Sequence, residues 1–443
     1  MNVIDEADFK VYLVGGCVRD TLLNLKPVDY DLATNAPLDS LLSILTPGYR
    51  VFQVGKQFST LVVRLSGFSV EMSLLRQRSR IEESHDDSDS VQFVMNSDGD
   101  IYSDLMCRDF TINSMAYTSV GTLIDPYDGE EDLNNRILKS IKPELVLNED
   151  PLRVIRALRF KLKYDLSMDG ELEEKLRNIA KTHVNLSVER LRDEFFKILL
   201  LDQPSIAIRE MIDYGLMAWY PFKNLICRMK GYDQQNPYHD KTLLEHTLTV
   251  LDQSPPIIEV RLAALFHDVG KPDVQTFEEI AHYYGHEKLS SEHTRKVLRA
   301  LKCSNQLMDD VTMLIAAHMF SPSDIGEKGI KRLIRKVGGF HQMRWLLDLM
   351  EADILGTAYP ERSVCMEPLR QFVDELEIAE TVFKRSDLNI SGKDLIQVGV
   401  TEGKQIGSCL GTVLELVMDG VLVNERDVLM DYVQQNMNDH MKK

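Results

Sequence analysis

The sequence has few cysteines and no long hydrophobic run. Its six cysteines among 443 residues are scattered without regular spacing, which argues against a disulfide framework and is typical of a reducing cytosol. No run approaches the roughly 20 apolar residues that would span a bilayer. The opening stretch MNVIDEADFK is acidic and lacks the apolar segment of a signal peptide. We therefore expect a cytoplasmic protein that does not bind membranes.

Positive charge is also scarce. The chain has 51 Lys and Arg against 69 Asp and Glu, which gives a formal net charge of -18. This balance excludes a diffuse cationic coat for nucleic acid but is compatible with a local basic groove. Hydrophobic residues make up 44% and charged residues 27% of the chain, proportions typical of a globular protein. The length indicates about two to four domains.

Local patterning changes along the chain from strand-like to helical. Residues 11 to about 140 contain β-type runs such as TLVVRLSGFSVEM. The polar segment 76–90, RQRSRIEESHDDSDS, lacks a periodic apolar face and is expected to be a mobile loop. From Glu149 onward apolar residues recur every three or four positions, the spacing of amphipathic helices. The predicted class is α+β, with a small mixed α/β head followed by an all-helical neck, body, histidine-rich region and tail. The expected domains are the head 1–145, the neck and body 146–235, the histidine-rich region 236–360 and the tail 361–443.

The stretch VYLVGGCVRDTLLNLKPVDYDLATNAP contains closely spaced carboxylates. Asp29 and Asp31 are two positions apart on an expected extended segment, so their side chains would point to the same face. Carboxylates held that close repel each other unless a cation lies between them, and Mg²⁺ prefers such oxygen ligands. Glu71, on an expected neighbouring strand, is a candidate third carboxylate, with an exposed strand residue as the alternative. For the aspartate pair the alternative is a solvated turn or a helix-capping pair.

Two glycines precede these aspartates. Gly15 and Gly16 would let the backbone approach a phosphate and offer its N–H groups, and Arg19 could add a bidentate, permanently charged clamp. The alternative is a tight strand-to-helix turn in which Arg19 pairs with Asp20, and the two interpretations are compatible. The stretch as a whole predicts a metal-assisted phosphate site.

Five motifs carry a family resemblance. LVGGCVRDTLL, DYDLAT, CRDFTINSMAY, IDPYDGEEDL and EDPLRVIRALRF, in this order and at these spacings, resemble the class II tRNA nucleotidyltransferase and poly(A) polymerase family over about the first 200 residues. Near the end of the chain DLNISGKDLIQVG, GKQIG and VLVNERDVL are similar to the tail of CCA-adding enzymes of the Bacillus type.

The resemblance implies nucleotidyl transfer with Mg²⁺ held by Asp29 and Asp31, because two such ions can stabilise both oxygens of an in-line displacement at phosphorus. It implies that Arg108 meets phosphate and that Asp109 accepts a hydrogen bond from a ribose hydroxyl. Cys107 stands where the family usually has another arginine. The loss of that cation could weaken triphosphate binding by about 1 kcal/mol.

The resemblance assigns the motif EDPLRVIRALRF to recognition of the base of the incoming nucleotide. In the family an Asp and an Arg with the spacing of Asp150 and Arg153 hydrogen-bond the base edges of CTP and ATP. A carboxylate accepts from the exocyclic amine that C and A both have, and a guanidinium donates to a ring nitrogen or carbonyl. Arg156 and Arg159 continue the same face at a spacing of three, and the resemblance extends nucleotide binding to them. The alternative is an ordinary amphipathic helix with an Asp150–Arg153 salt bridge.

The histidine-rich region has a metal-ligand pattern of its own. His246, the adjacent pair His267 and Asp268, and Asp353 occur in an order that resembles the HD phosphohydrolase superfamily. Imidazoles combined with carboxylates favour a divalent transition metal over Mg²⁺. Two further histidines are candidates for a second ion or for gripping a phosphate, namely His286 and His318. The alternative is a metal-bound or empty scaffold without turnover.

The leading functional hypothesis is template-independent addition or repair of the 3′-terminal CCA of tRNA from CTP and ATP. Variants that add only CC, add only the last A, or make poly(A) tails belong to the same class, and the unusual segment 76–90 leaves partial addition open. A second class is an HD-type phosphohydrolase with a degenerate head, and a third is a catalytically silent RNA-binding protein. The presence of both Asp29 and Asp31 argues against these last two.

Overall fold

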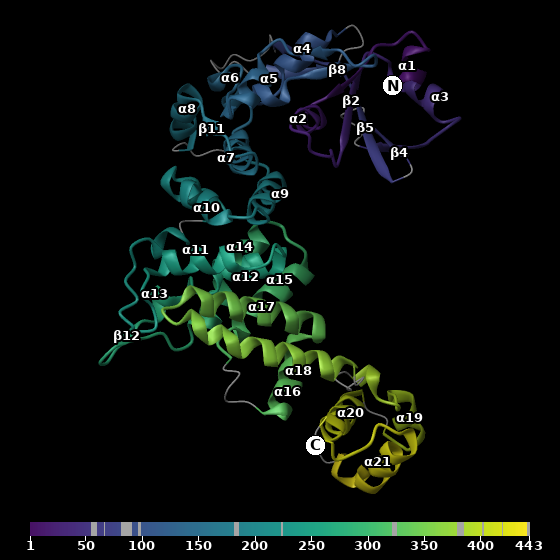
Figure 1. Cartoon of the computed structure of the whole chain (residues 1–443). Helices are drawn as coiled ribbons and strands as arrows, with labels where there is room; N and C mark the ends of the chain where they lie inside the picture. The colour runs from purple at the N-terminus through teal and green to yellow at the C-terminus, as the bar shows by residue number, and fades with distance from the viewer. Residues whose placement is uncertain are drawn as a thin grey trace. The chain divides into compact units, whose positions relative to one another are not determined.

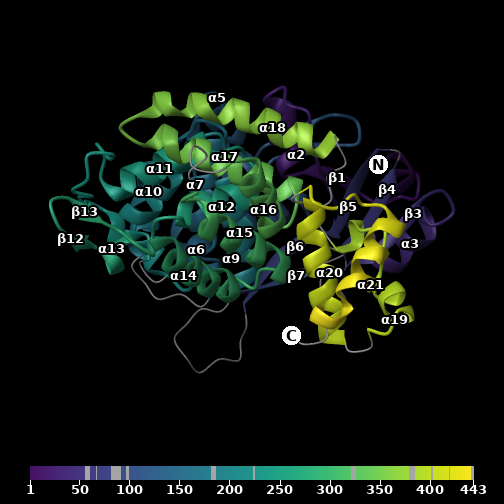
Figure 2. The same cartoon turned by 90° about the horizontal axis from the view of Figure 1, so that it is seen from below.

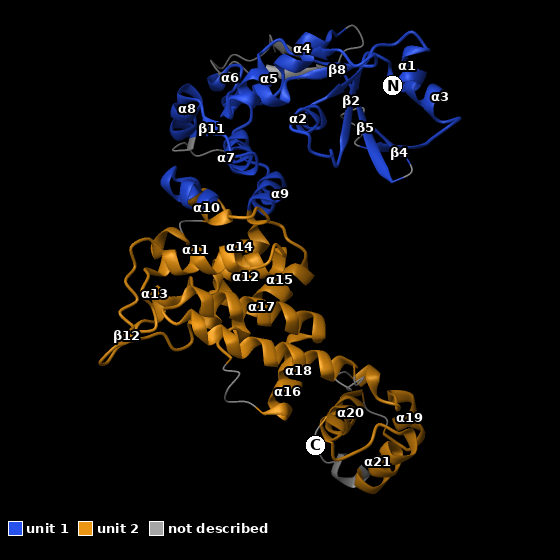
Figure 3. Cartoon of the chain, viewed as in Figure 1, with its two compact units in different colours: residues 1–198, 206–216 blue, residues 199–205, 217–443 orange. Residues whose placement is uncertain are grey.

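The computed structural model describes residues 1–54, 60–65, 67–80, 91–95, 99–180, 186–222, 225–320, 326–378, 385–400, 403–418 and 420–440. These residues form two compact units, one of residues 1–198 and 206–216 and the other of residues 199–205 and 217–443 (Figure 3). The first unit contains the large sheet, and the second is built almost entirely of helices (Figure 1).

The first unit is organised around a seven-stranded mixed sheet with strand order β3-β4-β5-β2-β1-β8-β9. Its strands are β1 Val11–Val14, β2 Tyr30–Thr34, β3 Arg50–Val54, β4 Thr60–Leu65, β5 Phe68–Leu74, β8 Ala116–Thr118 and β9 Leu123–Ile124. The shorter pairs are β6 Arg76–Arg80 with β7 Val91–Met95, and β10 Ile137–Leu138 with β11 Ser167–Met168. Strand β2 lies parallel to β5 and antiparallel to β1, so β2 is a central strand with neighbours on both sides.

Helices cover this sheet and continue beyond it. They are α1 Asn2–Asp5, α2 Gly16–Leu22, α3 Leu38–Leu45, α4 Ile101–Met106, α5 Gly129–Asn134, α6 Pro143–Glu149, α7 Arg153–Lys163, α8 Gly170–Ala180, α9 Val188–Leu199 and α10 Pro204–Asp213. Side chains alternate along β2. Leu32 therefore packs with Leu41 of α3 on one face, while Ala33 packs with Leu105 of α4 on the other. Asp31 shares the face of Ala33, two positions away.

The second unit is helical, as the apolar spacing of the sequence predicted. It comprises α11 Leu243–Gln253, α12 Ile258–Phe266, α13 Lys271–Val274, α14 His286–Ala300, α15 Asn305–Ala317, α16 Glu327–Val337, α17 Phe340–Gly356, α18 Met366–Ile378, α19 Gly392–Gln397, α20 Gly403–Met418 and α21 Arg426–His440, with a small β12 Thr276–Phe277 and β13 Ala281–His282 hairpin. Helices α11, α12, α15 and α17 pack together, and α18 lies along α17 (Figure 2). In the described part of the chain, no helix combines the length and apolar character that a bilayer span requires.

The loop predicted for residues 76–90 is partly wrong. Residues 76–80 form β6, which pairs antiparallel with β7, while residues 81–90 lie outside the described residues. The strand escaped detection because polar contacts and not a periodic apolar face secure its first residue. The backbone N–H and the Nε of Arg76 both donate to Asp104 Oδ1, at 3.1 and 3.0 Å.

Candidate active site and candidate metal centre

The predicted carboxylates gather at the sheet. Asp31 lies on β2 opposite Val14 of β1 and opposite Glu71 of β5, so Glu71 does occupy the neighbouring strand. Asp29 is exposed and lies one residue before β2 begins. Burial raises the pKa of Asp31, and the charge of Asp29 adds to this rise. Burial, Asp31 and Asp29 together raise the pKa of Glu71. This concentration of negative charge and the all-oxygen donor set suit a hard cation such as Mg²⁺.

The glycine turn lies against this group. Gly15 has a φ of 75° and immediately precedes α2. A Cβ at this position would lie 2.8 Å from Arg108 Nη1 and 3.5 Å from Asp31 Oδ2, so a side chain would displace the arginine. Only glycine accommodates both this backbone conformation and the close approach of Arg108.

Arg19 is held more tightly than a free phosphate clamp would be. It is 4% exposed, and it donates to Asn113 Oδ1 at 2.5 Å and to Tyr164 Oη at 2.5 Å. Its pairing with Asp20, the structural alternative expected from the sequence, is present at 2.7 Å. Its guanidinium also lies 4.3 Å from the centre of the Tyr164 ring.

One cavity of about 400 Å³ joins the predicted nucleotide-binding residues. Its lining includes Asp31 together with Gly15, Gly16, Arg19, Arg108, Asp109, Asp150, Arg153, Arg156 and Arg159. Asp29 and Glu71 are not among the described residues that line it. The cavity is also lined by Cys107, the position where the family usually has an arginine, and by residues that sequence reasoning missed, namely Arg76, Asn113, Phe160 and Arg190.

A buried carboxylate organises two of the arginines. Asp104 is fully buried and accepts hydrogen bonds from Arg76 through one oxygen and from Arg108 through the other, the latter at 2.7 Å. Burial alone would raise the pKa of Asp104, but Arg108 and Arg76 outweigh it and lower the pKa to about 2. Arg76 thus adds a guanidinium to the cavity wall, where Cys107 takes the place of the arginine that the family usually has. No motif marked Arg76 or Asp104, since their pairing spans 28 positions.

The Asp109 carboxylate accepts hydrogen bonds from two side chains of the protein, those of Arg156 and Asn113. Its Oδ2 accepts from Arg156 Nε at 2.9 Å and Nη2 at 2.6 Å, while Oδ1 accepts from Asn113 Nδ2 at 2.9 Å. Burial raises its pKa, but the charge of Arg156 and the bond from Asn113 outweigh this and lower the pKa to about 2. Asp109 is therefore ionised and fixed in orientation.

The arginines of α7 share a face, as their spacing predicted, but their partners differ from those expected. Arg153 donates to the carbonyl of Val146 at 2.9 Å and pairs with Glu149 at 3.4 Å. Asp150 pairs instead with Arg190 of α9, at 2.5 Å, so the expected alternative of an Asp150–Arg153 salt bridge is replaced by two separate pairs.

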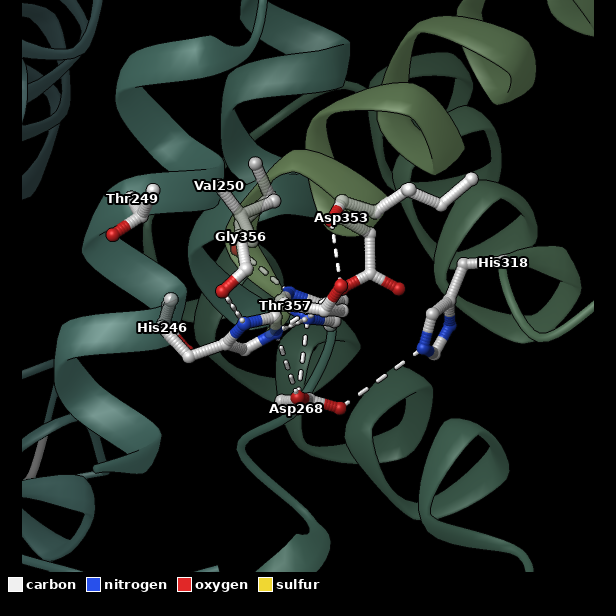
Figure 4. Close-up of polar contacts among 12 residues, drawn as sticks. His246, Thr249, Val250, Asp268, His318, Asp353, Gly356 and Thr357 are labelled. Atoms are coloured by element: carbon white, nitrogen blue, oxygen red, sulfur yellow. Dashed lines mark hydrogen bonds and ion pairs between the residues drawn. The ribbon is translucent and has the colours of Figure 1, made fainter. Parts of the chain in front are cut away.

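The second unit contains a cluster of six predicted side chains, of which Figure 4 labels His246, Asp268, His318 and Asp353. Three helices and the ends of two others contribute them, namely His246 from α11, His267 and Asp268 after α12, His286 from α14, His318 after α15 and Asp353 from α17. His246 Nε2 lies 3.1 Å from Asp353 Oδ1 and 3.4 Å from His267 Nε2. Asp268 connects the two halves of the cluster.

The two oxygens of Asp268 face different histidines. Oδ2 lies 3.2 Å from His267 Nε2, and Oδ1 lies 3.1 Å from His286 Nε2. His318 Nε2 is 3.4 Å from His286 Nε2. Ligand atoms within 4.8 Å of one another form three overlapping groups, of which one is His246, His267 and Asp268 and another is Asp268, His286 and His318. The geometry is compatible with two neighbouring cation positions.

Backbone carbonyls fix the orientation of all four rings. The Nδ1 atoms of His246, His267, His286 and His318 lie 2.6–3.1 Å from the carbonyl oxygens of Gly356, Ala264, Tyr283 and Ile315. Because a carbonyl only accepts, each Nδ1 carries a proton, and each Nε2 is directed to the centre of the cluster. This arrangement is typical of histidines that bind a metal, whose second nitrogen is held by a neighbouring acceptor.

The electrostatics of the cluster also favour a cation. Burial lowers the pKa of His267, but Asp268 and Asp353 outweigh it and raise the pKa to about 10. Lys271, which sequence reasoning missed, lies 2.6 Å from Asp268 Oδ2. A cavity of about 490 Å³ opens beside the cluster and is lined by Lys271, Asp268, His286, His318 and Asp353 together with Tyr238, Tyr283 and Tyr284.

Family models match three parts of the chain. Residues 11–139 match the "Poly A polymerase head domain", residues 165–222 the "Probable RNA and SrmB-binding site of polymerase A", and residues 280–433 the "tRNA nucleotidyltransferase domain 2".

Relatives match the chain over almost its whole length. The CCA-adding enzyme of Lactobacillus helveticus is 28% identical over 437 residues, covering 98% of this chain and 95% of the relative. That of Enterococcus faecalis is 29% identical over 441 residues, covering 98% and 93%.

Solved structures share the fold. The CCA-adding enzyme of Bacillus stearothermophilus in complex with CTP has a TM-score of 0.69 at 23% identity and covers 100% of this chain and 96% of its own. The Thermotoga maritima enzyme complexed with tRNA has a TM-score of 0.52 at 19% identity and covers 98% and 93%.

Proposed function

Because the chain belongs to the class II tRNA nucleotidyltransferase and poly(A) polymerase family, we propose that it adds or repairs the 3′-terminal CCA of tRNA from CTP and ATP. One observation carries this proposal. A single cavity unites a carboxylate of the sheet, Asp31, with the arginine face of α7. The reacting phosphates and the incoming base can therefore be bound side by side in one site.

Asp29 and Asp31 would hold Mg²⁺, with Glu71 as a third candidate. When bound, Mg²⁺ stabilises the attacking and the leaving oxygen of an in-line displacement at phosphorus. The 3′-hydroxyl of tRNA loses its proton to solvent and attacks the α-phosphorus of the triphosphate, the bond from that phosphorus to the bridging oxygen breaks, and pyrophosphate leaves. Arg108, oriented by Asp104, would neutralise the triphosphate. The backbone of Gly15 and Gly16, which carries no side chains, leaves space for the triphosphate to approach.

Base selection would come from the other end of the cavity. Asp150 accepts from the amine of C or A, and Arg153 donates to a ring nitrogen or carbonyl. Asp109, held by Arg156 and Asn113, would accept from a ribose hydroxyl. Arg159 is fixed by Glu194 of α9 at 2.7 Å and completes the face. We assign full CCA addition and not a partial variant, because both Asp150 and Arg153 line the site and the near full-length relatives named above are CCA-adding enzymes.

The test uses tRNAs that lack the last one, two or three nucleotides. Each triphosphate is supplied singly with Mg²⁺, and products are resolved at single-nucleotide resolution. Full CCA addition requires CTP on the two shorter tRNAs and ATP on the longest. Incorporation of ATP alone, or a run of adenosines, would instead identify an A-adding or poly(A) variant.

We further propose metal-dependent phosphoester hydrolysis at the histidine cluster as a second activity. The specific observation is that all six predicted side chains converge around Asp268. His246, His267, Asp268 and Asp353 would hold one divalent transition metal, and such a metal lowers the pKa of its bound water to near neutrality. His286 and His318 would hold a second ion or contact the phosphate.

Metal content and turnover test this second activity separately. Purified protein is analysed for bound metal and assayed for phosphatase and cyclic phosphodiesterase activity with added Ni²⁺, Co²⁺ and Mn²⁺. The double variant His267→Ala, Asp268→Ala should lose both metal and activity. His293→Ala, which removes a partly exposed histidine paired with Asp273, serves as the matched control. Metal bound without turnover would identify a structural scaffold.

We propose that these activities map onto a head (1–145), a neck and body (146–235), an HD domain (236–360) and an RNA-binding tail (361–443). The family-model matches to residues 11–139 and 165–222 support the first two. All six cysteines are free thiols, which supports a cytoplasmic location, since disulfides are rare there.

A further inference from the structure

We propose that Arg190 of α9 determines nucleotide choice by positioning the carboxylate of Asp150, an inference that rests on the proposed nucleotidyl transfer. Arg190 Nη2 lies 2.5 Å from Asp150 Oδ2, and both residues line the cavity of the head. The sequence offered Asp150 a partner only in the alternative interpretation, a salt bridge to Arg153 three residues away. The structure assigns it an arginine 40 positions later.

Helix α9 is anchored so that Arg190 reaches this point. Arg190 and Glu194 are one turn apart and therefore share a face of α9. Glu194, 5% exposed, accepts from Arg159 at 2.7 Å and from Arg156 at 3.4 Å. These bonds fix α9 against α7. Arg190 is thereby held next to Asp150, which lies between α6 and α7.

The pairing has a direct consequence for base selection. An ionised carboxylate only accepts hydrogen bonds, whereas a protonated one also donates. C and A present an amine where U and G present a carbonyl, so discrimination requires Asp150 to be ionised and correctly turned. From the described residues, the other oxygen of Asp150 receives one long hydrogen bond, at 3.3 Å from the Leu152 N–H. Arg190 therefore supplies the main restraint on the orientation of this carboxylate.

A purely structural role explains this pair poorly. The Arg190 side chain is 58% exposed, and exposed ion pairs contribute little to stability. An arginine has five N–H donors, so Arg190 can hold Asp150 and retain donors toward the cavity. Arg153, in contrast, has two N–H groups directed at the backbone carbonyls of Val146 and Cys107.

The experiment measures kcat and KM for all four triphosphates with the full-length protein and tRNA lacking its last nucleotides. We expect Arg190→Ala to lower the preference for CTP and ATP over UTP and GTP by about tenfold, the effect of losing one charge-assisted hydrogen bond, chiefly through KM. Arg190→Lys keeps the charge and should restore part of the preference. Arg177→Ala removes a similarly exposed, paired arginine of α8 and should leave the preference unchanged.

A double-variant comparison separates positioning from other roles. If Arg190 acts through Asp150, Arg190→Ala has no further effect on selectivity in an Asp150→Ala background. Equal weakening of all four triphosphates by Arg190→Ala, or full additivity with Asp150→Ala, would overturn the inference while leaving nucleotide addition intact. Failure of the unmodified protein to incorporate any triphosphate would instead refute the proposed function. Equilibrium binding of CTP against UTP then still tests Arg190.

Discussion

Asp31 of β2 and Glu71 of β5 occupy paired positions on two neighbouring parallel strands. The two carboxylates therefore lie at the same level of neighbouring strands, with Asp29 just before β2. The arrangement concentrates negative charge beside the cavity whose other walls carry arginines. A protein tolerates such crowding where a cation or a ligand offsets it.

Asp29→Ala and Asp31→Ala should each abolish nucleotide addition while preserving the fold. We expect a loss of at least about 100-fold in kcat, because electrostatic stabilisation of the transition state is of this size. Single-nucleotide extension assays and circular dichroism measure the two properties. Asp39→Ala, an exposed aspartate of α3, is the control. Near-normal addition by either variant would show that the metal site lies elsewhere.

Asp31→Asn should stabilise the metal-free protein at neutral pH. Burial and Asp29 raise the pKa of Asp31 in the folded state, so its ionised form is disfavoured by folding. This cost is present above the raised pKa and disappears as the pH falls below the ordinary value of 3.8. Thermal unfolding at pH 7 and pH 3 measures the difference. Mg²⁺ should stabilise the unmodified protein but not the variant, and equal stabilisation of both would contradict the assignment.

Gly15→Ala should impair both folding stability and activity. A residue with a side chain at this φ of 75° costs about 1–3 kcal/mol, and the added Cβ would collide with the Arg108 guanidinium. Chemical denaturation and the KM for CTP report the two effects. Gly48→Ala is the matched control, because a Cβ there meets no atom within 4 Å. An unchanged KM in Gly15→Ala would argue against a triphosphate at this turn.

Asp104→Asn should destabilise the head and weaken triphosphate binding. The pKa of Asp104 is about 2 against an ordinary 3.8, which corresponds to about 2–3 kcal/mol of stability at neutral pH. Because the folded pKa is lowered, this contribution is complete above about pH 4 and is lost as the pH falls toward 2. Urea unfolding at pH 7 and pH 3 should therefore show a smaller difference between variant and unmodified protein at pH 3. A constant difference would exclude this ionisation as its source.

Binding of tRNA should depend strongly on salt despite the net charge of -18. A narrow basic strip on the helical part would release counterions from the RNA, so affinity should fall at least about tenfold between roughly 50 and 200 mM salt. Filter binding or fluorescence anisotropy with an intact tRNA measures this slope. An affinity that stayed flat over this range would exclude the strip.

Much of the site follows from local spacing in the sequence. Gly15, Gly16 and Arg19 are close in the chain, and the period of a helix is enough to bring Arg153, Arg156 and Arg159 onto one face. Such patterns are visible because a helix or strand fixes the relation between neighbours within a few positions. The residues that gather around Asp268 are far apart in the chain, and they were predicted by another route, the resemblance of their order to the HD phosphohydrolase superfamily.

Tertiary structure alone decided which partners hold these residues. Arg76 with Asp104, and Arg190 with Asp150, pair across 28 and 40 positions, and no period in the sequence relates them. The strand β6 escaped prediction for the same reason, because its first residue is fixed by a buried carboxylate and not by an apolar face. The spacing of residues in the sequence determines which face of a helix or strand a side chain occupies. Only the packing of elements decides which charges meet, and burial decides how strongly they interact.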